Sequence, residues 1–423
     1  MKTPPTRISL APLMLGCAVV VAVTTTIAHA QPACGYEVTI IQTPVDCGFG
    51  FDNTTGFGLN EHGAVVGYYG CSDWEHREAF VWTVEEGFIT LERPQGVRSA
   101  IAVGVNDPGV ICGTLIVSGL GDRGFVYDNG EWTILHPLIP DAGWSGAAAV
   151  NNAGVVVGYR SLTEDLNPRN AYIWSADKGF TDLGVMTGPS SFADSISETG
   201  IVVGWAGVPS EIIADAFIWQ DEKLTLLGPV PGGFTSRPTA VTNEGVVLGR
   251  GLIDLKGFPI GAPRAFLWVD GVFEMLGVLP NHAWSTASDI QVARSVVVGA
   301  SWNVDDNPSI AHGFIWRDGI MTNLNDLVSP DLEIVIRSAQ AIVETGQILA
   351  NGNAKHRPVA FLLTPRAAPL GDLNGDCQVG VTDLLMLLSN WGSCENCAAC
   401  PADLDNNCVV GVSDLLTLLG NWG

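Results

Sequence analysis

One segment recurs seven times between residues 50 and 364, and this repetition limits the chain to a small set of folds. Each copy carries a four-residue marker that runs small, aromatic, aliphatic and, in most copies, Trp. The copies occupy residues 79–82, 124–127, 171–174, 216–219, 265–268, 313–316 and 360–363. Their aromatic residues lie 45 to 49 positions apart, close to the roughly 40 to 50 residues of one propeller blade. The spacing predicts an all-β body made of seven similar units.

A second marker precedes each of these segments and predicts a tight turn between two strands. Its pattern is Asn-x-x-Gly, three aliphatic residues and Gly, and it is clearest at residues 60–67, 106–113 and 151–158. At 197–204 and 242–249 a Ser or a Thr replaces the first Asn, and at 291–299 and 343–350 the pattern is kept only in part. Gly supplies the positive φ that such turns need. Each unit is therefore predicted to contain four strands, as at 147–150, 155–157, 171–174 and 179–183.

The ends of the repeat suggest how the body closes. The seventh unit stops at Leu363 without a fourth strand, and a strand-like segment at residues 36–41 precedes the first unit. Pairing the two would leave no open sheet edge. We therefore predict a seven-bladed β-propeller over residues 31–364, closed by the N-terminal strand. An open β-solenoid is the alternative.

The two markers resemble those of the HAF-repeat family of bacterial extracellular proteins, which is named for His-Ala-Phe at the start of the third strand. The resemblance covers roughly residues 50–364. Only His312-Gly313-Phe314 keeps the His in this chain. The resemblance implies export and the repeat itself, but it implies no reaction.

Residues 1–30 have the features of a secretory signal peptide. Lys2 and Arg7 form a basic start, residues 10–23 are almost wholly apolar, and Ala28-His29-Ala30 is a small-x-small cleavage pattern. A lipoprotein signal ending at Cys17 is the alternative. We expect an extracellular or cell-surface protein without a transmembrane segment. The net charge of −24 argues against nucleic acid and anionic membranes as partners.

Residues 371–423 hold a duplicated segment, separated from the body by a Pro-containing linker at residues 365–370. Residues 371–392 and 402–423 agree at 14 of 22 positions. Each begins with a 12-residue loop of the EF-hand type, in which oxygen ligands alternate around a calcium ion and position 7 supplies a backbone carbonyl. Positions 1, 3, 5, 7 and 12 are Asp372, Asn374, Asp376, Gln378 and Asp383, then Asp403, Asp405, Asn407, Val409 and Asp414. An apolar helical stripe follows each loop, at Leu384, Leu387, Leu388 and at Leu415, Leu418, Leu419. We therefore predict two calcium ions.

A loop and following helix, repeated, with Asp at position 12, resembles a type I dockerin. The resemblance implies docking onto a cohesin, with partner choice influenced by Val381, Thr382, Val412 and Ser413. Cys377 and Cys408 replace the usual Gly at position 6, which brings the sharp turn into question. The spacer carries Cys394, Cys397 and Cys400, which the family pattern lacks.

The cysteines of an exported chain are expected to form disulfides. Cys34 and Cys47 are one possible pair, but the pairing cannot be deduced from the sequence. Cys112, in an apolar run, is predicted to be the free thiol. Zinc or an iron–sulfur cluster is the alternative for the run from Cys394 to Cys400.

The body shows no motif of a serine hydrolase, zinc protease or phosphate loop. Its histidines are not at ligand spacing, and His312 is predicted to cap a strand. Asp107, Glu198, Glu244 and Glu344 lie in the Asn-x-x-Gly turns and are predicted to serve those turns. The tryptophans of the first marker are predicted to fill the core; they are Trp82, Trp174, Trp219, Trp268 and Trp316.

Other aromatic residues do not recur at the period of the unit. Their positions predict that they lie in long loops on one face of the body. Trp144, Trp205, Trp284 and Trp302 are the candidates for contact with a glycan. The alternative is that these rings anchor their own loops.

These features predict a secreted, noncatalytic binding or surface-assembly protein with a calcium-dependent docking module. A cohesin-like or cell-surface protein and a glycan are the expected partners. A secreted polysaccharide-degrading propeller enzyme and a structural envelope repeat protein are the alternatives. A pair of carboxylates across the central channel would favour the enzyme.

Overall fold

A computed structural model describes residues 34–43, 53–70, 76–135, 143–161, 169–184, 190–207, 214–254, 261–291, 295–303, 311–374, 377–394, 396–397 and 400–423. The predicted signal peptide and Cys47 lie outside these residues. The chain divides into two compact units, Ala33–Ala367 and, at the C-terminus, Ala368–Gly423. Each is described by itself below.

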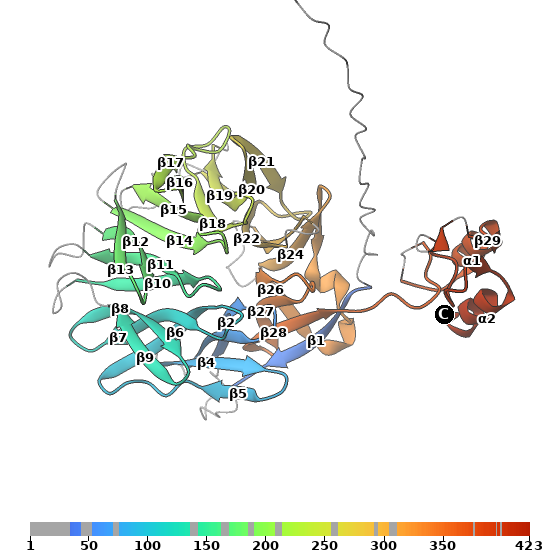
Figure 1. Cartoon of the computed structure of the whole chain (residues 1–423), viewed down its shortest axis with the longest axis horizontal. Coiled ribbons are helices and arrows are strands. Elements are labelled where there is room, and N and C mark those ends of the chain that lie inside the picture. The colour runs from blue at the N-terminus through green and yellow to red at the C-terminus, as the bar shows by residue number, and fades with distance from the viewer. Residues whose placement is uncertain are drawn as a thin grey trace, which may run out of the picture. The chain divides into compact units, whose positions relative to one another are not determined.

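The described part of the first unit contains seven antiparallel four-stranded sheets, called blades here (Figure 1). Blade 1 contains β2 (Asn53–Leu59), β3 (Val65–Gly70), β4 (Arg77–Thr83) and β5 (Gly87–Thr90). Blade 2 contains β6 (Val97–Val105), β7 (Ile111–Val117), β8 (Gly121–Asp128) and β9 (Glu131–Leu135). Blade 3 contains β10 (Ser145–Val150), β11 (Val156–Ser161), β12 (Arg169–Ser175) and β13 (Gly179–Gly184). The four strands predicted for residues 147–183 are those of blade 3.

The later blades follow the same order. Blade 4 contains β14 (Ser190–Ile196), β15 (Val202–Gly207), β16 (Ala214–Gln220) and β17 (Lys223–Leu226). Blade 5 contains β18 (Arg237–Val241), β19 (Val247–Ile253), β20 (Ala262–Val269) and β21 (Val272–Gly277). Blade 6 contains β22 (Trp284–Gln291), β23 (Val296–Trp302), β24 (His312–Arg317) and β25 (Ile320–Asn323). Two short 3₁₀ helices, η3 (Leu324–Leu327) and η4 (Pro330–Leu332), lead to blade 7.

Blade 7 draws its strands from both ends of the body. It contains β26 (Ile334–Ile342), β27 (Ile348–Ala354), β28 (Arg357–Pro365) and, as its fourth strand, β1 (Tyr36–Ile41). β1 pairs antiparallel with β28, with Val38 opposite Leu363 and Ile41 opposite Ala360. The N-terminal segment therefore supplies the strand that the seventh unit lacks (Figure 1).

The core of the body uses the aromatic residue of the first marker rather than its Trp. The side chains at this position are 0% exposed in every blade; they are Phe80, Phe125, Tyr172, Phe217, Phe266, Phe314 and Phe361. Among the marker tryptophans only Trp316 is buried, and the other four are half-buried. The other four pack against the core clusters of the blades, so the prediction that all five fill the core is confirmed in part. Each Trp is the penultimate residue of its strand, next to the hairpin that leads to the outermost strand.

The Asn-x-x-Gly turns are hydrogen-bonded from one blade to the next. The Asn60 side chain accepts from the backbone N–H groups of His62 and Ala64, at 3.1 and 2.9 Å, and donates to the Asn106 carbonyl, at 2.9 Å. Asn106 and Asn151 donate in the same way to the following turn. In blade 7, the backbone N–H of Glu344 donates to the Glu61 carboxylate of blade 1, at 3.1 Å. The turns thus stabilise contacts between blades as well as their own conformation.

The turn acids partly follow the prediction. Asp107 accepts from the Glu61 N–H, at 2.9 Å, and Glu198 accepts from the Asn152 N–H, at 2.8 Å. Both bonds join neighbouring blades, so the acids serve turns other than their own.

The C-terminal unit contains two short helices, α1 (Val381–Ser389) and α2 (Val412–Gly420). A two-stranded sheet joins the two halves, formed by β29 (Gly392–Ser393) and β30 (Val409–Val410). Its small core contains Val379, Leu387, Ala402, Val410 and Leu418. In the described part of the chain no helix is long and apolar enough to cross a membrane.

Candidate functional site

The last Asp of each predicted calcium loop organises its own loop. Asp383 accepts from the backbone N–H groups of Leu373, Asn374 and Gly380, at 2.8, 3.0 and 2.8 Å. Burial raises the pKa of the Asp383 carboxyl, but these donors together outweigh it and the net pKa is lowered. The carboxylate is therefore charged at neutral pH. Since Asp383 is the third residue of α1 and bonds the N–H before the helix, it also caps α1.

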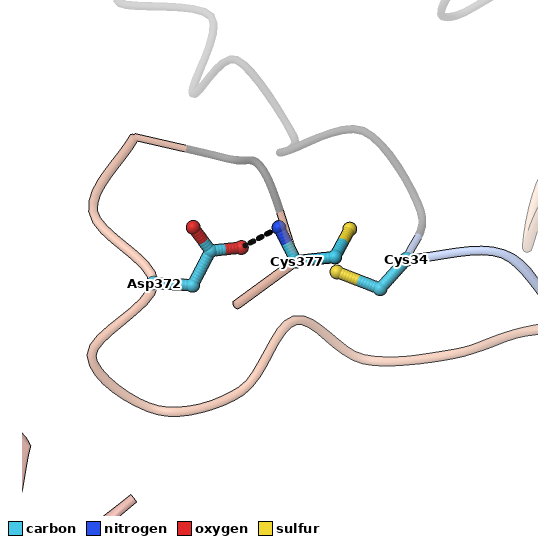
Figure 2. Close-up of side chains that lie close together, drawn as sticks. All are labelled: Cys34, Asp372 and Cys377. Atoms are coloured by element: carbon cyan, nitrogen blue, oxygen red, sulfur yellow. Dashed lines mark hydrogen bonds between the residues drawn. The ribbon is translucent and has the colours of Figure 1, made fainter. Parts of the chain in front are cut away.

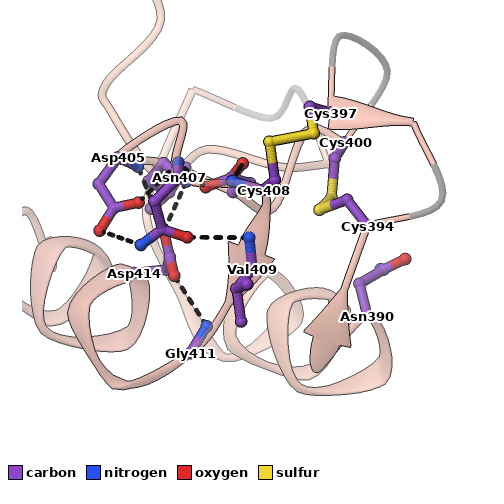
Figure 3. The surroundings of a disulfide bond; sticks show 12 residues. Asn390, Cys394, Cys397, Cys400, Asp405, Asn407, Cys408, Val409, Gly411 and Asp414 are labelled. Atoms are coloured by element: carbon purple, nitrogen blue, oxygen red, sulfur yellow. Dashed lines mark hydrogen bonds between the residues drawn. A yellow bond between two sulfur atoms is a disulfide. The ribbon is translucent and has the colours of Figure 1, made fainter.

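The second loop repeats this arrangement (Figure 3). Asp414 accepts from the N–H groups of Leu404, Asp405 and Gly411, at 2.7, 3.2 and 2.8 Å, and its pKa is lowered by the same balance of burial and hydrogen bonds. Asp403 accepts from the N–H groups of Asn407 and Cys408. Carboxylate oxygens of Asp403, Asp405 and Asp414 lie within 4.8 Å of one another. Converging carboxylates of this kind are the ligands that calcium prefers.

The first loop follows the second where it is described. Asp372 is buried and accepts from the Cys377 N–H at 2.9 Å (Figure 2), which matches the bond from Cys408 to Asp403. Asn374 and Gln378 are exposed, as are Asp405, Asn407 and Val409 of the second loop. Asp376 lies outside the described residues. Positions 1 and 12 are thus buried in both loops, and the intermediate ligand positions that the structure describes are exposed.

The cysteines at position 6 adopt the turn that Gly usually makes. Cys377 and Cys408 both have a φ of 70°, a left-handed conformation that costs a residue with a side chain about 1 to 3 kcal/mol. Cys408 is bonded to Cys397, and Cys394 is bonded to Cys400 (Figure 3). The departure from Gly therefore preserves the turn. The Cys394–Cys400 run forms disulfides, not a zinc or iron–sulfur site.

The helices of this unit expose a repeated apolar stripe. Val381, Leu385, Leu388 and Trp391 recur at helical spacing on the first half, and all four are exposed. Val412, Leu416, Leu419 and Trp422 repeat this on the second half. Thr382 and Ser413, the other predicted docking residues, are also exposed. The stripe predicted from Leu384, Leu387 and Leu388 is buried only in part. Leu387 is buried, whereas Leu388 and its counterpart Leu419 are exposed.

The candidate glycan-binding tryptophans of the body are not loop residues, with one exception. Trp205, Trp284 and Trp302 lie in β15, β22 and β23, and only Trp144 lies outside a strand. The loop assignment was wrong for these three because the strands extend beyond the apolar runs that marked them. Trp205 stacks on Phe192, with ring centroids 4.3 Å apart, and Trp284 meets Trp302 edge-to-face at 5.9 Å. All four candidates are half-buried.

A cavity of about 330 Å³ lies where the first strands of blades 4, 5 and 6 meet. It is lined by Asp194, Trp205, Arg237 and Arg250, among others. Burial raises the pKa of Asp194 to about 7, against the lowering effect of the two guanidinium groups. Asp289 lies on the same strand as the lining residue Thr286 but does not line the cavity. Its carboxylate accepts from the backbone N–H groups of Ile290 and Ile342. The described lining of this cavity thus contains a single carboxylate.

A larger cavity, of about 520 Å³, lies in blade 6 and holds His282 and His312. Their rings are 5.2 Å apart between centroids. This pair could not be predicted from the sequence, because 30 positions separate the two residues and the spacing matches no ligand motif. Cys112 is the free, buried cysteine among the described residues, as predicted. Burial raises its pKa to about 12, so the thiol is unreactive.

No protein-family model and no curated protein matches the chain. Solved structures do match the body. An oligogalacturonate lyase in complex with manganese shares 10% identity at a TM-score of 0.50, covering 79% of this chain and 98% of its own. The β-propeller domain of the trilobed protease from Pyrococcus furiosus shares 10% identity at a TM-score of 0.49, covering 74% of this chain and 93% of its own. At these identities the likeness concerns the fold alone. The seven four-stranded sheets described above define the body as a seven-bladed β-propeller.

Proposed function

We propose that this protein is an exported, noncatalytic binding protein whose C-terminal module binds two calcium ions and docks onto a partner. One observation carries the proposal. Both loops place a buried Asp at position 1 and a buried, charged Asp at position 12, held by matching sets of backbone donors. Two independent acidic turns would have no reason to share this arrangement.

The exposed stripe supports docking. An apolar surface of this kind on a small unit is characteristic of an interaction site, and it follows both loops at the same positions. The partner is a protein with a complementary apolar face. A cohesin domain or another cell-surface protein fits the resemblance of this module to type I dockerins.

The body supports the binding role in a different way. We infer that the pairing of β1 with β28 closes the propeller, because it gives the last blade its fourth strand and removes two open edges. The HAF-like repeat and the disulfides of the second unit agree with export to an oxidising environment. A closed propeller is a rigid support for a ligand site.

Calorimetry on residues 31–423 tests the metal proposal. We expect uptake of two calcium ions, and of one ion in Asp383→Asn and in Asp414→Asn, because each substitution removes one charge from one loop. Asp270→Asn, in an exposed turn of the propeller, is the matched control and should still bind two. Absence of calcium uptake at millimolar concentration would refute the proposal.

A panel of purified cohesin domains tests docking. We expect calcium-dependent binding that Leu385→Glu and Leu416→Glu together abolish, since both introduce charge on the exposed stripe. These side chains are 61% and 64% exposed, so calcium uptake should be retained. Binding that survives both substitutions, or that persists in excess chelator, would contradict docking through this surface.

A further inference from the structure

The cavity of about 330 Å³ lies beside the first strands of blades 4, 5 and 6. First strands of neighbouring blades contact one another, so these strands form the inner layer of the propeller (Figure 1). Each first strand has a β-bulge at the same position, where one residue has no partner on the second strand. These residues are Phe57, Val103, Ala148, Asp194, Thr239, Ser288 and Gln340. Asp194 is the charged residue of this set, and a bulge can direct such a side chain into a site.

Blade 5 places two positive charges opposite each other at this cavity. Arg237 and Arg250 are directly paired across β18 and β19, and both line the cavity. In blade 4 the pair at the same position is Phe192 and Trp205. Like charges at directly opposite positions destabilise a sheet, so stability gives no reason for two arginines here. A bound anion does give a reason, because it would offset the repulsion between them.

Trp205 fixes the position of one of these arginines. Its ring stacks on Phe192, with the ring centroids 4.3 Å apart and 16° between the ring planes. The guanidinium carbon of Arg237 lies 4.1 Å from the centroid of the Trp205 ring, which is a cation–π contact. Trp205 thus acts on the cavity through Arg237, as a positioning residue.

Asp194 and Arg250 leave their polar groups to a ligand. In the described part of the chain, neither side chain has a hydrogen bond or an ion pair. A guanidinium group has five N–H donors, and a carboxylate accepts at both of its oxygens. The cavity thus offers donors on its blade 5 side and an acceptor on its blade 4 side.

The charges and hydroxyl groups of the lining indicate the class of ligand. Two guanidinium groups and one carboxyl give the cavity a net charge of at least +1, which a single carboxylate balances. A phosphate dianion would add a further negative charge beside Asp194. Thr239 and Thr286 add hydroxyl groups to the lining, and these can donate to or accept from the hydroxyl groups of a ligand. A molecule with one carboxylate and several hydroxyl groups is a sugar acid.

The size of the cavity limits the ligand further. Its volume of about 330 Å³ is near the lower end of the roughly 300 to 1,000 Å³ of small-molecule sites. The cavity therefore suits a single sugar ring.

We propose that this cavity binds a uronic acid, whose carboxylate accepts from Arg250 beside the charge of Arg237 and whose hydroxyl groups donate to Asp194. This ligand class rests on the binding role proposed above and makes it specific. It does not depend on the calcium module, which belongs to the other unit. Failure of calcium uptake and failure of uronic acid binding can therefore be recognised separately.

Calorimetry on residues 31–423 tests the ligand class with galacturonic acid, glucuronic acid, galactose, glucose and glucose 6-phosphate. We expect at least one uronic acid to bind more tightly than both neutral sugars and glucose 6-phosphate. Arg250→Gln should weaken this binding about tenfold or more, because a hydrogen bond between charged groups is lost. The melting temperature of the variant checks its fold.

Lys223→Gln is the matched control, since it removes one positive charge from an exposed position of blade 4. It should bind as the unaltered protein does. No measurable binding of either uronic acid, a preference for a neutral sugar or for the phosphate, or unchanged affinity in Arg250→Gln would overturn the proposal.

Trp205→Phe and Trp205→Leu separate a positioning role from a structural one. Both variants reduce the packing on Phe192 and should lower the melting temperature, but only Phe keeps an aromatic face for the Arg237 guanidinium. We expect uronic acid affinity to fall about three- to fivefold in Trp205→Leu, the effect of a lost cation–π contact. Trp205→Phe should bind nearly as the unaltered protein does. Equal affinity in the two variants would show that the ring does not position Arg237 for the ligand.

Asp194→Asn tests the balance of charge in the cavity. The amide keeps the shape and an acceptor oxygen but removes the negative charge, so two positive charges remain uncompensated. We expect glucose 6-phosphate to bind about tenfold more tightly to this variant than to the unaltered protein at pH 8. Asp270→Asn, in an exposed turn of blade 5, is the control and should show no gain. An unchanged affinity for glucose 6-phosphate in Asp194→Asn would contradict the selection of a single carboxylate by charge.

Discussion

The propeller and the C-terminal module are both repeats, but they use their repeated apolar residues in opposite ways. The seven marker aromatics of the propeller are fully buried, whereas Leu385 and Leu416 of the module are more than 60% exposed. In a ring each blade has a neighbour on both faces, so every copy of the residue is covered. A two-copy module has no further copy to cover its outer face. Repetition thus completes a core in one unit and leaves a surface for a partner in the other.

The largest effect should come from a marker aromatic. We expect Phe217→Ala to lower the free energy of unfolding of the propeller by about 3 to 5 kcal/mol, because it leaves a cavity between two blades. Trp219→Ala, on the same strand but half-buried, should cost clearly less. Denaturant unfolding followed by tryptophan fluorescence in Phe217→Ala, and by circular dichroism in both variants, gives the comparison. Equal losses would mean that the Trp shares the core role.

The strand β1 offers a sharper test of closure, because neighbouring residues face different surroundings. Ile41 is 0% exposed and Ile40 is 45% exposed. We expect Ile41→Ala to cost about 2 to 5 kcal/mol and Ile40→Ala about 0.5 kcal/mol or less. Thermal unfolding of both variants measures the difference. A negligible loss in Ile41→Ala would show that the ring does not need its N-terminal strand.

Asp194 is a position where the propeller departs from its repeat. Its pKa is raised to about 7, against about 3.9 for an unfolded Asp, so the folded state binds the proton more tightly and stability falls as pH rises between these values. We expect Asp194→Asn to stabilise the propeller by about 1 kcal/mol at pH 8, a value reduced by residual exposure to solvent. The gain should vanish near pH 4. Melting curves across this range would contradict the assignment if the gain were independent of pH.

The smallest change in stability is expected on the exposed stripe of the module. Leu416→Ala should alter the free energy of unfolding by about 0.5 kcal/mol or less, since the side chain is already in water. Differential scanning calorimetry in saturating calcium measures this. A loss comparable to that of Phe217→Ala would mean that the module buries its repeat after all.

Periodicity was a sufficient guide to the blades, because a marker repeated in register must occupy the same place in each. It did not reveal which aromatic residue is buried. Phe217 and Trp219 are both apolar and lie two positions apart on one strand. Only their distance from the end of the strand distinguishes them, because β16 ends three residues after Phe217 and one residue after Trp219. The strands also extend beyond their apolar runs at Trp205, Trp284 and Trp302. A prediction from the apolar runs alone therefore placed these residues in loops.

The predicted calcium loops and the histidine pair of blade 6 show the same contrast. The predicted ligands Asp403 and Asp414 follow from local spacing alone, so a pattern along the chain is enough to propose them. His282 and His312 meet only because β22 and β24 belong to one sheet with β23 between them.

The pairing of β1 with β28 also has a consequence for the order of events in folding. Ile41 and Ala360 are about 320 positions apart, so the first strand of the body to be synthesised has no partner until the last one has been made. Contacts of such long range form slowly, and both bare edges can meanwhile pair with other chains. A partly folded chain is therefore most exposed to aggregation before blade 7 is complete. Once blade 7 is complete, it joins the two ends of the body, so neither end can unravel alone.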